Sequence, residues 1–347
     1  MPAWGELLSE LQGLLKSGIP APLDVLRRKY LVQLQNYTHN NVILYATRWT
    51  PPLPGLPPEF VLITEEDIQG LMEVIRGLSP GSLDLIIHSP GGSAEATEAM
   101  VSYIRSKFSH VRVFVPHAAM SAATMLACSA NRIVMGKHSF LGPVDPQIVL
   151  NTPLGAMSIP AQAILDQFET AKQECQDPKN LAAWLPMLSQ YGPALLVQCR
   201  EALDLSKELV SEWLTKYMFA GDSEAPRKVQ KIANALADHK TFKTHGRHIG
   251  REQARSFGLT IDDLEVDQKL QDLVLSIYHA TSHTFNGTGA VKIIENHLGR
   301  AYVKSIPVVP VPPKAPTQQP PPQGTVQGAA TAIALTSLQG VGSIFTV

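Results

Sequence analysis

The sequence predicts an α/β fold built on a largely parallel sheet. Strand-like and helix-like segments alternate between residues 83 and 136. The strand-like segments are near-continuous apolar runs, such as Leu85-Ile86-Ile87. Alternation of this kind favours parallel pairing with right-handed crossovers, and strands that are apolar on both faces are typical of a sheet covered on both sides.

The first part of the chain predicts two helices, a strand and a loop before this repeat begins. Apolar residues recur at helical spacing over residues 4–35, with a break at Pro20 and Pro22, which indicates an N-terminal helical arm. Residues 41–46 are a strand candidate. The proline-dense segment 51–58 predicts an irregular loop, because proline removes backbone donors. A helix is then expected from Thr64, a suitable N-cap.

The predicted elements continue in this order: strand 83–89, helix 93–108, strand 111–116, helix 121–131, strand 132–136, helices 160–175, 178–190, 192–219 and 225–238, a mixed segment 239–270, and a last helix near 268–284. Eight prolines fall within the seventeen residues from Pro307 to Gln323, which predicts a disordered tail. We therefore divide the chain into an N-terminal helical arm (1–35), a catalytic core (36–150), a mainly helical extension that completes the site (151–304) and a Pro-rich disordered tail (305–347).

Composition excludes several classes of protein. The 29 basic and 30 acidic residues leave a net charge of −1, so no nucleic-acid partner is expected. The three cysteines (Cys128, Cys175 and Cys199) have no CxxC or Cys/His spacing, which favours a reducing, cytoplasmic location and no metal site. No apolar stretch reaches the roughly 18 residues of a transmembrane helix. No Walker lysine or GxGxxG motif is present, so no cofactor and no ATP requirement is expected.

Two strand–turn–helix junctions contain the candidate catalytic residues. Ser121 follows the strand 111–116 and opens a predicted helix, where backbone N–H groups and the helix dipole favour developing negative charge. Gly91 and Gly92 follow Pro90 at the mouth of another helix and offer unobstructed N–H groups, to which Ala122 adds a third. Together they predict a nucleophile with an oxyanion hole. The alternative is an ordinary Pro-Gly-Gly turn beside a capped helix.

Three segments of the sequence resemble the motifs of a known protein family. The segments Ser89-Pro90-Gly91-Gly92, Ala119-Met120-Ser121-Ala122-Ala123-Thr124 and Leu141-Gly142-Pro143-Val144-Asp145-Pro146-Gln147 resemble the serine dehydrogenase proteinase family, over roughly residues 22–290. That family is a distant branch of the Clp protease and crotonase superfamily and is related to signal peptide peptidase A. The resemblance implies a Clp/crotonase-like ββα spiral with a helical C-terminal extension, and a homo-oligomer that is trimer-based or larger.

The resemblance also implies a catalytic triad in the chain order serine, aspartate, histidine. Carried onto this sequence, the serine is Ser121, the aspartate is Asp145 and the first choice of histidine is His245. His248 and His138 are alternative bases. Asp145 has an alternative reading as the cap of a turn or helix.

A lysine base is a further alternative, because the related signal peptide peptidases use a Ser-Lys dyad. Lys172 lies at a suitable distance from Ser121 along the chain. Glu169, three residues before Lys172, instead favours an ion pair on the helix surface.

The function expected from these residues is that of an ATP-independent serine endopeptidase, a hydrolase that cleaves a peptide or protein substrate through an acyl-enzyme on Ser121. Two alternatives remain. One is a crotonase-like hydratase or hydrolase of acyl-CoA, which would use the same oxyanion pocket. The other is a catalytically silent oligomeric scaffold, whose Pro-rich tail binds partners.

Overall fold

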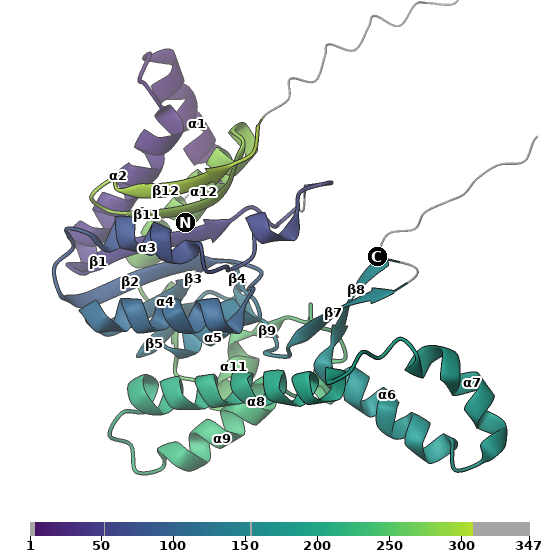
Figure 1. The fold of residues 1–347 in the computed structure, drawn as a ribbon. Helices are drawn as coiled ribbons and strands as arrows, with labels where there is room; N and C mark the ends of the chain where they lie inside the picture. Colours follow the sequence, from purple (N-terminus) through teal and green to yellow (C-terminus); the bar gives the residue numbers. More distant parts are fainter. Residues whose placement is uncertain (1–3, 52, 153–154, 308–347) are drawn as a thin grey trace, which may run out of the picture. The chain divides into compact units, whose positions relative to one another are not determined.

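The main sheet has seven strands in the order β10-β5-β3-β2-β1-β11-β12. The structure, a computed structural model, describes residues 4–51, 53–152 and 155–307 (Figure 1). Strands from β10 to β1 pair in parallel, whereas β11 and β12 are antiparallel. The strands are β1 (Asn41–Thr47), β2 (Gly81–His88), β3 (Phe108–Val115), β5 (Arg132–Met135), β10 (Ile261–Asp263), β11 (Ala290–Asn296) and β12 (Ala301–Ser305).

Successive residues of the central strands face two separate cores. Tyr45 and Ile87 belong to one core, whereas Leu44 and Ile86 belong to the other. All four are buried, because helices cover both faces of the sheet. The predicted α/β fold with a largely parallel, doubly covered sheet is confirmed.

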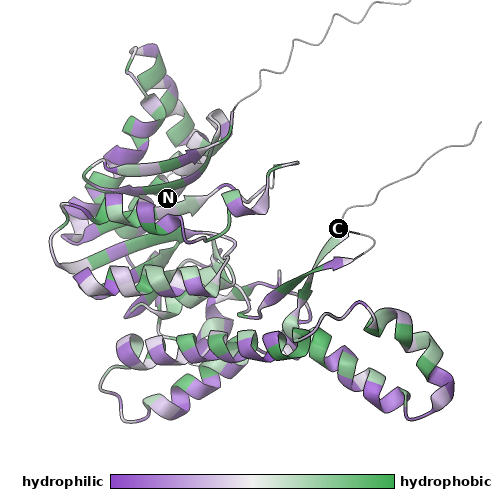
Figure 2. Cartoon of the chain, in the orientation of Figure 1, coloured by the Kyte–Doolittle hydropathy of each residue, from purple (hydrophilic) through white to green (hydrophobic). Residues whose placement is uncertain are grey.

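Helices α3, α4, α5, α8 and α9 contribute to the first core, and α2 and α12 contribute to the second. Apolar and polar residues alternate along the helices in Figure 2, as expected for helices that each bury one face. The helices are α1 (Trp4–Lys16), α2 (Pro22–Thr38), α3 (Asp67–Ile75), α4 (Ala94–Lys107), α5 (Ala122–Cys128), α6 (Ala161–Glu174), α7 (Pro178–Leu188), α8 (Leu195–Trp213), α9 (Ala225–Leu236), α10 (His239–Phe242), α11 (Arg251–Phe257) and α12 (Gln268–Gly287), with short helical turns η1 (Pro58–Phe60), η2 (Leu214–Met218) and η3 (Leu264–Val266).

A second, three-stranded sheet positions the candidate site. Its order is β4-β6-β9, formed by β4 (Ala118–Ala119), β6 (Phe140–Leu141) and β9 (Ile249–Gly250). Ser89, directly after β2, pairs with Ala119 through an isolated bridge. The segments around Ser89, β4, β6 and β9 therefore lie next to one another in this order across the small sheet.

The segment 151–304, expected to be mainly helical, contains helices α6 to α12 but also several strands. A hairpin of β7 (Gln147–Thr152) and β8 (Gly155–Pro160) precedes α6, and β10, β11 and β12 complete the main sheet. The predicted tail also begins too early, because Ser305 ends β12. The rest of that predicted tail, 308–347, lies outside the described residues.

None of the helices in the described ranges is long and apolar enough to cross a membrane.

Candidate active site

Ser121 has a backbone conformation that L-residues rarely adopt. Its φ is 51° and its ψ is −119°, immediately before α5. A conformation of this kind costs about 1–3 kcal/mol, and such residues cluster at active sites. The Ser121 side chain does not cap its own helix, and its hydroxyl has no hydrogen-bond partner in the described part of the chain. Capping therefore does not explain this serine.

The glycine loop packs directly against Ser121. A Cβ on Gly91 would lie 2.7 Å from the Ser121 Cβ and 2.6 Å from the Met120 carbonyl oxygen. A Cβ on Gly92 would lie 2.3 Å from the Ile63 carbonyl oxygen. Both glycines have positive φ, 97° and 156°, so any side chain is excluded by conformation as well as by space.

Two of the three expected oxyanion donors are free. The N–H of Gly91 donates to the Ser89 hydroxyl at 3.1 Å, so it is already engaged. The N–H groups of Gly92 and Ala122 donate to no acceptor among the residues that the structure describes. Ile63 holds the loop on both sides, since its N–H donates to Gly91 and its carbonyl accepts from Ser93.

Asp145 is buried and faces two imidazoles. Its side chain is 1% exposed. One carboxylate oxygen pairs with Nδ1 of His245, and the other lies 3.3 Å from Nδ1 of His239. The Gln147 amide lies 3.3 Å from the same oxygen as His239. No helix begins at Asp145, and its carboxylate faces these two histidine side chains instead.

The two histidines differ in what surrounds them. His239 lines a hollow of about 430 Å³ together with residues of α6, α8 and α9, and Ser121 does not line that hollow. His245 lies in the segment between α10 and β9, anchored by the buried residues Phe242 and Ile249. In both cases Nδ1 faces Asp145, which leaves Nε2 for another partner. His239 was not among the residues predicted from the sequence. The only local feature there is Asp238, directly before it, which is a typical helix N-cap.

The other candidate bases are engaged elsewhere. The ring of His248 stacks on Phe140 with 3.6 Å between centroids. Nε2 of His138 lies 2.9 Å from the Pro116 carbonyl oxygen. Lys172 is exposed on α6 and forms an ion pair with Glu169 at 2.9 Å, as its spacing suggests.

Thr124 connects the nucleophile helix to the segment that leads to Asp145. Its hydroxyl, which is buried, lies 2.7 Å from the Ala119 carbonyl oxygen and accepts a hydrogen bond from the Gly142 N–H at 3.0 Å. Residues 142–145 continue directly from β6, and β4 leads directly to Ser121. The pairing of β4, β6 and β9 thus brings the serine, aspartate and histidine segments to one place.

The arrangement suits acyl transfer. No group of three or more His, Cys, Asp or Glu side chains that could hold a metal occurs in the part of the chain that is described. A hydroxyl at a strained helix start, two free amides beside it and an Asp–His pair are the parts that such chemistry uses.

Comparison with known proteins identifies a matching family and similar proteins. A model of the family described as ClpP-like SDH-type serine proteinase matches residues 21–284. An uncharacterized protein of Methanocaldococcus jannaschii, MJ0137, is 28% identical over 277 residues, which cover 75% of this chain and 86% of the relative. A second uncharacterized protein of that organism, MJ1495, is 30% identical over 185 residues, which cover 52% of this chain and 55% of the relative.

One similar solved structure is a serine-to-alanine mutant of the 1510-N membrane-bound stomatin-specific protease. It has 15% sequence identity and a TM-score of 0.33, and the match covers 58% of this chain and 75% of that chain.

Proposed function

Because the chain belongs to the ClpP-like SDH-type serine proteinases, we propose that it hydrolyses peptide bonds through an acyl-enzyme on Ser121. The observation that carries the proposal is the strained, uncapped Ser121 packed against the glycine loop. A serine held at this cost beside free amide donors is typical of a nucleophile.

In the first half of the proposed reaction, the Ser121 oxygen attacks the carbonyl carbon of the scissile peptide bond. His245 takes the hydroxyl proton on Nε2, while its Nδ1–H donates to Asp145, which stabilises the imidazolium. The amides of Gly92 and Ala122 bind the oxyanion. His245 then returns the proton to the leaving amine, and the C–N bond breaks.

In the second half, water attacks the acyl-enzyme. His245 accepts a proton from that water and delivers it to the Ser121 oxygen as the acid is released. Ser121 and His245 form no hydrogen bond in the described residues, so the proposal requires their contact to form when substrate is bound. Catalytic hydrogen bonds often tighten only at that stage.

Labelling with a fluorophosphonate tests the nucleophile, because this probe forms a bond to an activated serine oxygen with loss of fluoride. Wild type is expected to label, and Ser121→Ala is expected not to. Ser93→Ala is the matched control, since Ser93 also opens a helix but caps it through a bond to the Ala96 N–H. Labelling that survives Ser121→Ala would overturn the proposal, and absence of labelling in wild type would favour the scaffold or acyl-CoA alternatives.

The same assay identifies the base. His245→Ala is expected to reduce the labelling rate by at least a hundredfold, in line with the usual contribution of a general base. His248→Ala and Lys172→Ala are expected to label nearly as fast as wild type. His239→Ala tests the other histidine that lies against Asp145. If the labelling rate falls further in His239→Ala than in His245→Ala, then His239 is the base.

We also propose that the chain self-associates, as a trimer or a larger assembly. Helix α7 has no buried residue although it carries Leu181 and Leu185, and the β7–β8 hairpin exposes Val149 and Met157. Exposed apolar side chains on neighbouring turns of a helix or on paired strands favour association. Met187 of α7 is also exposed, whereas Trp213 of α8 is buried in the core.

Light scattering during size-exclusion chromatography tests this association. Wild type is expected to elute as a trimer or larger, and the double variant Val149→Glu, Leu185→Glu as a smaller species. Val266→Glu is the control, because Val266 is also exposed but lies on η3. A monomeric wild type would refute the proposal.

A further inference from the structure

A second cavity lies at the ends of β1 and β2, and none of the candidate catalytic residues lines it. Its volume is about 330 Å³, at the lower end of the range for small-molecule sites. Its walls come from Trp4 of α1, the end of β1 at Thr47, His88 at the end of β2, and α12. Ser121, Asp145 and His245 do not line it.

Buried polar atoms without partners gather at this cavity. The hydroxyl of Thr47, a fully buried residue, and Nδ1 of His279 have no hydrogen-bond partner in the described ranges, and both residues line the cavity. The indole N–H of Trp49, adjacent in sequence to the lining residue Arg48, is also unpartnered. Such atoms are rare in native proteins and costly, which indicates a partner that is not part of the chain.

The cavity has one cationic group and no carboxylate in its lining. The Arg48 guanidinium donates a hydrogen bond to the Thr288 carbonyl oxygen at 3.4 Å and forms no ion pair with any residue that is described. Guanidinium groups bind carboxylates through paired, charge-assisted hydrogen bonds. The complementary ligand therefore carries a carboxylate or a similar anion.

The rest of the lining is rich in flat rings. Trp4 lies with its ring 5.7 Å from that of His279 at 69°, and Tyr278 lies 5.1 Å from His88 at 74°. The pKa of His88 is lowered to about 3, mainly by burial and further by His117, so this imidazole is neutral at pH 7. Neutral rings of this kind pack well against an aromatic ligand.

We propose that this cavity binds a small aromatic monocarboxylate. Arg48 holds the carboxylate, Trp4 and Tyr278 contact the ring, and the Thr47 hydroxyl and His279 Nδ1 supply hydrogen bonds to polar substituents. His88 connects the cavity to the catalytic side, because the next residue is Ser89, whose hydroxyl accepts the Gly91 N–H.

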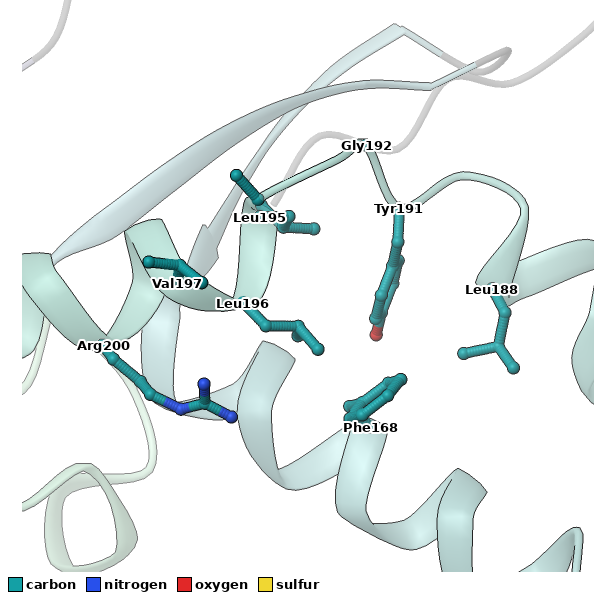
Figure 3. A pocket seen from close by; sticks show the side chains of 9 residues that line it. Phe168, Leu188, Tyr191, Gly192, Leu195, Leu196, Val197 and Arg200 are labelled. Atoms are coloured by element: carbon teal, nitrogen blue, oxygen red, sulfur yellow. The ribbon is translucent and has the colours of Figure 1, made fainter.

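The cavity drawn in Figure 3 is the natural comparison, since it also combines aromatic rings with an arginine. Phe168, Tyr191 and Arg200 line it, with a volume of about 380 Å³. None of the unpartnered buried atoms of the described chain lies in its lining, and the Tyr191 hydroxyl donates to Gln167 at 2.7 Å. This cavity therefore lacks the unpartnered buried polar atoms that indicate a specific ligand.

Binding of indole-3-acetate and benzoate to the full chain tests the proposal, with tryptophan fluorescence and thermal unfolding as readouts. At least one probe is expected to bind wild type and raise its Tm. Arg48→Met is expected to weaken binding at least tenfold, as is replacing indole-3-acetate by the neutral indole-3-acetamide. Ser282→Phe, which fills the cavity, is expected to abolish binding.

Arg200→Met is the matched control and is expected to bind like wild type. Each variant is first shown to unfold cooperatively without ligand, so that loss of binding is not loss of fold. No Tm change at millimolar probe in wild type would overturn the proposal. Binding that is lost in Arg200→Met and kept in Arg48→Met would also overturn it, because the probe would then occupy the cavity in Figure 3.

Discussion

Ser121 shows at the scale of one residue how stability and reactivity oppose each other. Its positive φ raises the free energy of the folded state, since a Cβ is poorly accommodated there. Its hydroxyl recovers none of that cost by capping α5. The conformation persists because β4 on one side and the buried helix α5 on the other hold the chain in place.

Replacing this serine with glycine is expected to stabilise the protein. Ser121→Gly should raise the free energy of unfolding by about 1 kcal/mol, because relief of strain exceeds the extra flexibility of the unfolded chain. Ser121→Ala keeps the Cβ and is expected to change it by less than half as much. Chemical denaturation measures both, and a less stable Ser121→Gly protein would contradict the strain argument.

Gly91 packs against the backbone around Ser121 and leaves no room there for a side chain. Gly91→Ala is expected to reduce fluorophosphonate labelling at least a hundredfold, since the new methyl group would collide with Met120, Ser121 and Ala122 within 2.8 Å. Gly81→Ala is the control, because Gly81 has a φ of 129° but open space around a Cβ. Equal losses of labelling in both variants would indicate a general backbone effect.

At the scale of elements, the buried hydroxyl of Thr124 links α5 to the segment that follows β6. Thr124→Val keeps the shape of the side chain but leaves the Gly142 N–H without its acceptor. We expect a loss of about 1–3 kcal/mol in stability together with a slower labelling rate, and rescue by Thr124→Ser.

Thr281→Val separates the positioning role of Thr124 from a merely structural one. Thr281 is also buried, and its hydroxyl donates to the Ile277 carbonyl in α12. Its loss should lower stability and leave the labelling rate unchanged. A Thr124→Val protein that labels at the wild-type rate would remove the positioning role.

Local pattern was enough to predict the elements whose signals lie within a short window. The strand near 83–89 and the helix after Ser93 needed only an apolar run and an N-cap, and the structure has them as β2 and α4. The short strands β6 and β9 exist only as partners of each other and of β4, so no window contains their signal.

Strand β11 shows most clearly why part of the sheet escaped prediction. Lys292 and Glu295 interrupt its apolar run, yet both are fully buried. Lys292 pairs with Asp67, and Glu295 pairs with Arg27 and Arg28, each more than 200 residues away. For the site, the local motifs indicated Ser121 and the glycines, and the family resemblance indicated Asp145, while His239 depended on a contact across 94 residues.

At the scale of the whole molecule, buried histidines make stability depend on pH. The pKa values of six histidines are lowered in the folded protein, in each case chiefly by burial: His88, His110, His117, His279, His283 and His297. The unfolded chain therefore binds more protons than the folded chain below the ordinary histidine pKa of about 6.5. Their contribution is fully present above that pH and is lost on acidification.

We expect the free energy of unfolding to fall as pH drops from 6.5 toward 3, with His88 alone contributing up to about 1.4 kcal/mol per pH unit. Denaturation curves at several pH values measure this slope. His88→Gln should flatten it, whereas His39→Asn, a change at an exposed histidine, should not. An identical slope in His88→Gln would show that the burial of His88 is not responsible.

The two antiparallel strands also decide where the chain can be shortened. The match to the family ends at residue 284, before β11 begins, although β11 covers the edge of β1 and neutralises Asp67 and Arg27. A chain cut at 288 would expose β1 as an open edge, remove Lys292 from the buried Asp67, and leave Arg27 with Asp24 but without Glu295, so it should aggregate. A chain cut after 307 keeps β12 and should remain soluble, which makes the boundary of the folding unit wider than the boundary of sequence similarity.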